Sequence, residues 1–221
     1  MRAMILAAGR GTRMGSLTAD TPKPLLRVGD RYLIEYSIAA LTRIGIKEIV
    51  INVSYRAEQI KAALSDGKQY GVTIHYSEEV EALETGGGIF QALPLLGPEP
   101  FIVLSSDVVS DFPMEKLFSH PKELAHVVLV DNPTFHPQGD FALSGHAVCH
   151  QGHEKLTYAN IGIYRPELFA GCKPGKFRLG DLLNQAITQK KVSGEYFTGL
   201  WHNLGSAVEL AQLCAVLDNP L

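Results

Sequence analysis

The hydrophobic pattern of the chain alternates between short apolar runs and longer stretches with helical spacing. Apolar runs typical of buried strands cover residues 4–8, 48–53, 72–76, 101–104 and 125–130. Apolar residues recur at helical spacing over residues 33–41, 58–64, 84–93 and 207–217. Strands that alternate with helices of this length are typical of βαβ units. The pattern therefore predicts an α/β fold with a doubly wound, mostly parallel sheet.

Composition narrows the class of protein but does not identify it. The 221 residues suffice for one domain with a sizeable core, and 46% hydrophobic with 19% charged residues is ordinary for a globular protein. A net charge of −3 argues against a generic nucleic-acid-binding or membrane-binding surface. We expect no signal peptide and no membrane span. Three cysteines, Cys149, Cys172 and Cys214, do not form a disulfide framework, so we expect a cytoplasmic protein.

The first predicted strand leads directly into Gly9-Arg10-Gly11-Thr12-Arg13. Glycine allows the backbone to turn sharply and approach a ligand closely, and N–H groups at such a turn bind phosphate oxygens. Arg13 adds one cation, and Lys23 adds a second on a segment that flanking prolines stiffen. The segment lacks the features of a Walker loop and the third glycine of the dinucleotide fingerprint. It predicts a different kind of phosphate-binding loop.

The sequence LAAGRGTRM followed by TPKPLL resembles the signature of the sugar-1-phosphate nucleotidyltransferases, and the resemblance extends over nearly the whole chain. These enzymes join a nucleoside triphosphate to a sugar 1-phosphate and release pyrophosphate. The resemblance implies their Rossmann-like nucleotide-diphospho-sugar transferase fold. It implies nucleotide binding by Ala7, Ala8, Gly9, Gly11, Thr12, Arg13 and Lys23. Arg13 and Lys23 are the implied catalytic cations, whereas Gly15 and Ser16 depart from the usual motif.

A second glycine-rich segment opens the helical stretch at 84–93. Three successive glycines indicate close approach of the backbone to a ligand or to another element. In the resembling family a loop at this place contacts the nucleotide, which implies binding by Thr85, Gly86 and Gly87. The sequence LETGGGIFQALPLLG is most similar to the branch that uses UTP and N-acetylmuramate 1-phosphate, in peptidoglycan recycling. Mannose-1-phosphate guanylyltransferases usually carry a variant nearer to LGTAGAL.

Two segments are candidates for a magnesium site. The run at 101–104 ends in two serines and Asp107, similar to the family motif whose aspartate holds Mg²⁺ and acts in catalysis. Magnesium commonly takes one or two protein oxygen ligands together with substrate phosphates. Asp111 is an alternative to Asp107. The later tryptophan motif resembles the segment that supplies the second ligand, but it carries Asn203 in place of the usual aspartate, and an amide oxygen can still ligate.

Sugar contacts are implied for Asp140, in a Gly-Asp-Phe triplet, and for Asn160, in a strand similar to the family's N-x-G-I-Y motif. A plain turn residue is an equal alternative for Asp140. Lys155 is a candidate for the sugar phosphate, with a solvated surface charge as the ordinary alternative. The hairpin-rich stretch 142–164 predicts a small lid over this half of the cleft.

A cluster of potential metal ligands falls on the same stretch and consists of His146, Cys149, His150 and His153. Such side chains can bind zinc, but no second Cys/His pair follows at finger spacing. We interpret the cluster as incidental residues on an exposed hairpin.

These patterns lead to one leading hypothesis and two alternatives. We expect a single domain in which residues 1–131 bind nucleotide, 132–206 bind sugar and 207–221 form a C-terminal helix against the sheet. The implied reaction makes a UDP-sugar and pyrophosphate from UTP and N-acetylmuramate α-1-phosphate, with Mg²⁺. The alternatives are a mannose-1-phosphate guanylyltransferase and, because of Asn203, a nucleotide-sugar-binding protein with weak activity. The oligomeric state is left open.

Overall fold

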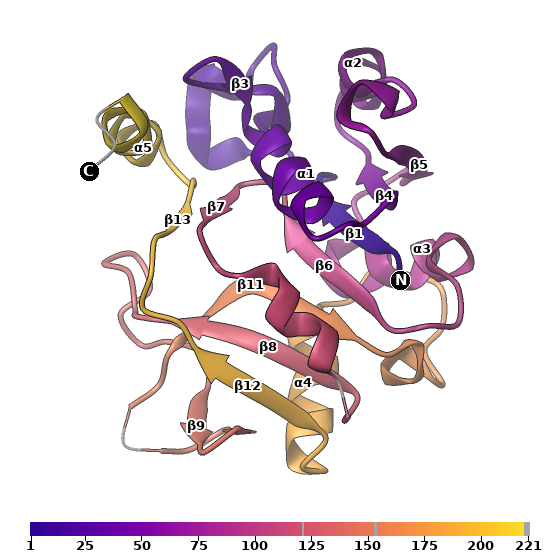
Figure 1. Cartoon of the computed structure of the whole chain (residues 1–221), viewed down its shortest axis with the longest axis vertical. Helices are drawn as coiled ribbons and strands as arrows, with labels where there is room; N and C mark the ends of the chain where they lie inside the picture. Colours follow the sequence, from indigo (N-terminus) through magenta and orange to yellow (C-terminus); the bar gives the residue numbers. More distant parts are fainter. Residues whose placement is uncertain (121, 153, 219–221) are drawn as a thin grey trace.

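The computed structural model describes residues 1–120, 122–152 and 154–218, and its centre is a sheet of nine strands. These are β1 (Ala3–Leu6), β4 (Glu48–Val53), β5 (Thr73–Glu78), β6 (Phe101–Ser105), β8 (Ala125–Val130), β9 (Ala142–Ser144), β10 (Ala147–Cys149), β11 (Thr157–Tyr164) and β12 (Val192–Tyr196). They lie in the order β5-β4-β1-β6-β11-β8-β12-β10-β9 (Figure 1). Two small ladders accompany the sheet, β2 (Arg27–Val28) with β3 (Arg31–Tyr32) and β7 (Val108–Ser110) with β13 (Trp201–Asn203).

The strand directions make the sheet mostly parallel, as predicted. β5, β4, β1 and β6 pair in parallel, and so do β8 and β12. β11 and β10 run antiparallel to their neighbours. As a result, the carboxyl ends of β1 and β6 and the start of β11 meet at one edge of the sheet, where ligands bind in open α/β sheets.

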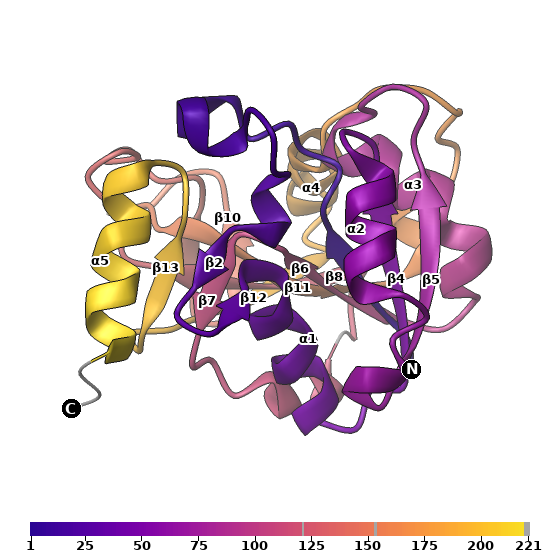
Figure 2. The same cartoon turned by 90° about the horizontal axis from the view of Figure 1, so that it is seen from above.

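Helices cover both faces of the sheet. They are α1 (Leu33–Arg43), α2 (Ala57–Leu64), α3 (Glu84–Leu96) and α4 (Leu179–Thr188). Successive strand residues point to opposite faces. Ile5 of β1 packs in one buried cluster with Ile38 of α1, whereas its neighbour Met4 packs in another with Ile89 of α3 and Leu183 of α4. The predicted doubly wound arrangement is therefore confirmed (Figure 2).

One strand of the sheet lies where the sequence predicts an insertion. β11 belongs to the stretch 142–164, which we expected to form a hairpin-rich lid, yet it pairs with β6 and β8 in the middle of the sheet. Its buried residues Ala159, Ile161 and Ile163 explain this position, since a central strand needs apolar side chains. Only β9 and β10 form the predicted hairpin, and they extend the outer edge of the sheet instead of covering its ligand-binding edge.

The described part of the C-terminal helix α5 (Ala207–Asp218) packs beside β2 and β13 and not against the main sheet, contrary to expectation. Leu213 lies in a small separate cluster with Val28 of β2, Val109 of β7 and Leu204. Figure 2 shows α5 beside β13, away from the large sheet. Among the described helices, none combines the length and the apolar character that crossing a bilayer requires.

Candidate functional site

A cleft of about 400 Å³ opens at the carboxyl ends of β1 and β6. Its walls come from the segment after β1, the start of α3, the turn after β6 and the start of β11. The predicted site residues that line it are Ala7, Ala8, Gly9, Gly11, Thr12, Arg13, Lys23, Thr85, Asp107 and Asn160. The structure thus brings together predicted site residues that are far apart along the chain. Ala7 and Asn160, the outermost two, are separated by 153 positions, counted from 7 to 160.

The loop after β1 depends on glycine for its shape. Gly11 has a φ of 65°, in the left-handed region that L side chains rarely adopt. A Cβ there would also lie 3.1 Å from Lys23 Cβ and 3.2 Å from Thr18 Cγ2. The Thr18 hydroxyl donates to the Gly11 carbonyl oxygen at 2.9 Å, which closes the turn. The turn leaves the Arg13 guanidinium exposed at the cleft, without an ion pair to any described residue.

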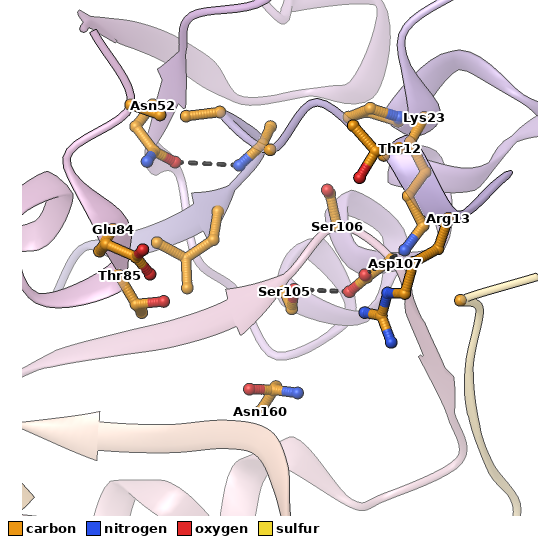
Figure 3. A pocket seen from close by; sticks show the side chains of 18 of the residues that line it. Thr12, Arg13, Lys23, Asn52, Glu84, Thr85, Ser105, Ser106, Asp107 and Asn160 are labelled. Atoms are coloured by element: carbon orange, nitrogen blue, oxygen red, sulfur yellow. Dashed lines mark hydrogen bonds and ion pairs between the residues drawn. The ribbon is translucent and has the colours of Figure 1, made fainter. Parts of the chain in front are cut away.

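Lys23 and Asp107 form an ion pair inside the cleft. The Lys23 Nζ lies 2.5 Å from Asp107 Oδ2, and the side chains are only 11% and 21% exposed. Ser105 Oγ donates to the other oxygen, Asp107 Oδ1, at 2.6 Å. Figure 3 shows Lys23, Arg13 and Asp107 gathered on one side of the cleft, opposite Glu84 and Thr85. This side of the cleft therefore holds two cations and one carboxylate around the same space.

The donor set around Asp107 fits a magnesium ion. The Asp107 carboxylate and the Ser105 and Ser106 side chains line the cleft and offer oxygen atoms, the ligands that Mg²⁺ prefers. Among the described residues no three His, Cys, Asp or Glu side chains gather as metal ligands. This is compatible with magnesium, which commonly takes one or two carboxylates plus substrate phosphates.

Asn203, the second predicted ligand, does not line this cleft. It lines a second cavity of about 300 Å³, together with Trp201 and Glu209. The backbone next to Asn203 is nevertheless bound to the backbone of Asp107, because Leu204 N–H donates to the Asp107 carbonyl oxygen at 2.9 Å. Asp111 also lies outside the lining of the cleft, and its backbone N–H donates to the Leu200 carbonyl oxygen.

The glycines at 86 and 87 face another element of the protein. A Cβ at Gly86 would lie 2.6 Å from the Phe177 ring, and a Cβ at Gly87 would lie 2.3 Å from the Gly175 carbonyl oxygen. Gly87 N–H donates to the Phe177 carbonyl oxygen at 3.1 Å. Of the three residues predicted here to bind nucleotide, only Thr85 lines the cleft.

The two predicted sugar contacts occupy different places. Asn160 lines the cleft and has a φ of 56°, at a register shift of β11, and such strained non-glycine residues cluster at functional sites. Asp140 lies outside the cleft lining, where one oxygen accepts from Tyr158 N–H at 2.8 Å and the other contacts His136 Nε2 at 3.1 Å. Lys155 is exposed, and its carbonyl oxygen accepts from Asn132 Nδ2.

The histidines of the edge hairpin form no metal site among the described residues. His150 Nε2 lies 3.2 Å from the Asn184 carbonyl oxygen and 3.2 Å from Thr188 Oγ1, so it contacts α4. His153 falls outside the described residues. The interpretation of His146, Cys149 and His150 as incidental stays a prediction.

Two buried polar residues of the cleft, Asn52 and Glu79, were not predicted from the sequence. Each is only 3% exposed, and both lie in the cleft wall. One signal was available, because Asn52 is the one polar residue within the apolar run Ile49–Val53. Glu79 gave no such signal, since it follows another glutamate at the end of β5.

Comparison with known proteins supplies the family. A profile for nucleotidyl transferases matches residues 2–140. The chain belongs to the nucleotidyl transferase family. It is 44% identical to the N-acetylmuramate alpha-1-phosphate uridylyltransferase of Neisseria meningitidis serogroup B, covering 98% of each chain. It is 32% identical to the protein of the same name from Caulobacter vibrioides, covering 92% of this chain and 91% of that one. The predicted resemblance is confirmed.

Two further comparisons bear on the alternatives and on the fold. The mannose-1-phosphate guanylyltransferase catalytic subunit beta of Drosophila melanogaster is 40% identical, but the match covers only 60% of this nucleotidyl transferase and 38% of the insect protein. A crystal structure described as a glucose-1-phosphate thymidylyltransferase from Bacillus anthracis superimposes with a TM-score of 0.87 at 20% identity, covering 100% and 97% of the chains. The predicted fold is confirmed.

Proposed function

We propose that this nucleotidyl transferase forms a UDP-sugar and pyrophosphate from UTP and N-acetylmuramate α-1-phosphate. One observation carries the proposal, namely 44% identity over 98% of the chain to an enzyme with that name. The cleft supports it, because Lys23, Arg13 and Asp107 surround one space large enough for a nucleotide. The sequence LETGGG, most similar to the muramate-phosphate branch, points the same way.

The reaction needs no nucleophile from the protein. An oxygen of the sugar phosphate attacks the α-phosphorus of UTP, and the bond from that phosphorus to the bridging oxygen breaks. Pyrophosphate leaves with the bonding electron pair. Catalysis of such a step consists of positioning the two substrates and stabilising negative charge.

The loop after β1 and three side chains of the cleft have roles in that chemistry. The backbone N–H groups of the loop that holds Gly9 and Gly11 bind phosphate oxygens. Lys23 and Arg13 stabilise the charge on the α-phosphate and the departing pyrophosphate. Asp107 holds the Lys23 ammonium inside the cleft through their 2.5 Å contact, so the cation needs little reorganisation when the substrate binds.

We propose magnesium as the cofactor, with Asp107 as its protein ligand. When bound, the ion would supply further neutralisation of the phosphate charge. The place of Asp107 beside Ser105 and Ser106 supports this role. The ligand role of Asn203 stays a prediction. Asn203→Asp tests it, because an added carboxylate at a true ligand position lowers the magnesium concentration required for half-maximal rate.

We assign the sugar to the half of the cleft that contains Asn160, and a contact with Asp140 stays a prediction. We also propose that the enzyme works in the cytoplasm, because all three cysteines are free.

A substrate panel tests the proposed function. UTP and GTP are each combined with N-acetylmuramate 1-phosphate and mannose 1-phosphate, and pyrophosphate release is measured. We expect the highest kcat/KM for UTP with N-acetylmuramate 1-phosphate. Preference for GTP with mannose 1-phosphate would establish the guanylyltransferase alternative. Tight nucleotide binding by calorimetry without any pyrophosphate would establish the binding-protein alternative, which Asn203 motivates.

A further inference from the structure

Two buried polar side chains connect the two walls of the cleft. Asn52 lies on β4 and Glu79 lies directly after β5, and each is 3% exposed. Asn52 Nδ2 donates to Glu79 Oε1 at 2.6 Å. Burying a carboxylate is costly unless hydrogen bonds compensate it, and Glu79 has no ion pair with any residue that the structure describes. Such a costly arrangement needs an explanation.

Each end of the pair binds the backbone of a different cleft wall. On one side Ala7 N–H, in the loop after β1, donates to Asn52 Oδ1 at 2.9 Å. On the other side Leu83 N–H, directly before α3, donates to Glu79 Oε2 at 2.9 Å. Ala7 lines the cleft, and so do Glu84 and Thr85, the two residues after Leu83. The hydrogen bonds therefore run from one wall to the other without interruption.

The third glycine of the triplet makes room for this pair. A Cβ at Gly88 would lie 2.5 Å from Glu79 Oε1 and 2.9 Å from Asn52 Nδ2. Neither contact leaves space for a methyl group, because real Cβ atoms do not approach heavy atoms below 3.0 Å. Gly88 is thus explained by the pair, whereas Gly86 and Gly87 are explained by the segment 175–178.

We infer that Asn52 and Glu79 are positioning residues that fix the spacing of the phosphate-binding loop and the start of α3, and thereby set the affinity for UTP. This inference rests on the proposed function for the identity of the nucleotide. Both polar atoms of each side chain are engaged with the protein, so the pair acts through the backbone at Ala7 and Leu83. Neither side chain is assigned a role in the chemical step.

Single substitutions break the pair in opposite ways. In Glu79→Gln, the side chain keeps a single oxygen for the two donors, Leu83 N–H and the Asn52 amide. The new amide N–H group at 79 then faces one of these donors, which loses its acceptor. In Asn52→Asp, two carboxylates face each other. Loss of a hydrogen bond to a charged group raises the KM for UTP roughly tenfold to a hundredfold, with kcat within about threefold of the parent.

The double variant Asn52→Asp with Glu79→Gln restores every hydrogen bond of the pair and moves the negative charge from position 79 to position 52. The carboxylate at 52 accepts from Ala7 N–H and from the amide at 79, whose oxygen accepts from Leu83 N–H. We expect its KM for UTP to return to within about threefold of the parent, given the context dependence of such bonds. A double variant as weak as Glu79→Gln would overturn the inference, since the carboxylate at 79 would then act on the ligand itself. Unchanged KM in both single variants would also overturn it.

Two controls separate this inference from the proposed function. Glu78→Gln removes a neighbouring carboxylate whose side chain is 57% exposed and pairs with Lys61, and it should leave the KM unchanged. Amide hydrogen exchange without nucleotide reports on Ala7 and Leu83 directly. Exchange should accelerate in the single variants and slow again in the double variant, even if the parent makes no UDP-sugar. If a single variant fails to fold, the inference is tested by the KM for UTP and the amide hydrogen exchange of the double variant.

Discussion

Two glycine-rich segments of this chain have similar composition but opposite surroundings. The loop that holds Gly9 and Gly11 faces the cleft, and a Cβ at Gly9 would meet no described atom within 4 Å. The triplet at the start of α3 faces the protein, where Gly87 would meet the Gly175 carbonyl oxygen at 2.3 Å. In both segments the missing Cβ leaves room for another group to approach. Only the fold decides whether this is a ligand or another part of the chain.

The backbone conformations of the two segments differ as well. Gly11 occupies the left-handed region with a φ of 65°, which glycine adopts without steric cost. The triplet lies inside α3, where glycine costs roughly 0.5–1 kcal/mol per residue relative to alanine. The close packing of the segment 175–178 and the space for the Asn52–Glu79 pair compensate for that cost. Four substitutions, two of them paired with a control variant, test this comparison.

The largest effect should come from the cation that the first segment positions. Lys23→Ala should lower kcat by about 10²–10³-fold, because removal of one preorganised charge-stabilising group costs about 3–4 kcal/mol in the transition state. Pyrophosphate release under saturating substrates measures it, with thermal unfolding to confirm the fold. Turnover equal to that of the parent would contradict the role of Lys23.

Gly87→Ala should destabilise the protein by about 1–3 kcal/mol, the usual cost of overpacking, because backbone atoms block the added methyl group. Urea unfolding measures the change. Gly180→Ala is the matched control within α4, since a Cβ there meets nothing within 4 Å. It should raise stability by roughly 0.5–1 kcal/mol, as expected for glycine to alanine in a helix. Equal effects at 87 and 180 would contradict the packing explanation.

Gly11→Ala should cost about 1–2 kcal/mol of stability for the left-handed backbone alone. The contacts with Lys23 and Thr18 should add to that cost. Gly45→Ala provides the comparison, because Gly45 has a φ of 85° but no atom within 4 Å of its Cβ position. In urea unfolding, the loss of stability in Gly11→Ala beyond the loss in Gly45→Ala measures the contribution of packing in the loop. No excess would show that the loop relaxes freely.

Gly9→Ala should give the smallest change in stability, within about 0.5 kcal/mol, because its Cβ would point into open space. The same methyl group should raise the KM for UTP, since the nucleotide is expected against this loop. Initial-rate kinetics of Gly9→Ala measure the KM for UTP, and urea unfolding of the same variant measures its stability. An unchanged KM would mean that UTP does not approach Gly9.

Local patterns in the sequence predicted much of the fold. The apolar runs that became β1, β4, β6 and β8 are buried on both faces, so they read as nearly continuous hydrophobic segments. β5 is an edge strand of the sheet, and its two end residues are exposed. The stretch at 33–41 became α1, with Glu35 accepting from Tyr32 N–H at its start. β11 was expected as a strand but within the lid. It contains the polar residue Asn160 at a register shift, which interrupts the apolar pattern, so its place in the middle of the sheet was not predicted.

Three features follow from local sequence patterns, namely the family, the strand–helix alternation and the residues of the loop after β1, because each depends on neighbours along the chain. Tertiary folding selected which distant residues share the cleft. It paired Lys23 with Asp107, joined Asn52 to Glu79 and directed Asn203 into a different cavity. A residue type shows what a side chain can bind. Which atoms lie within reach depends on how the strands are ordered and how the helices pack, and no local pattern contains that information.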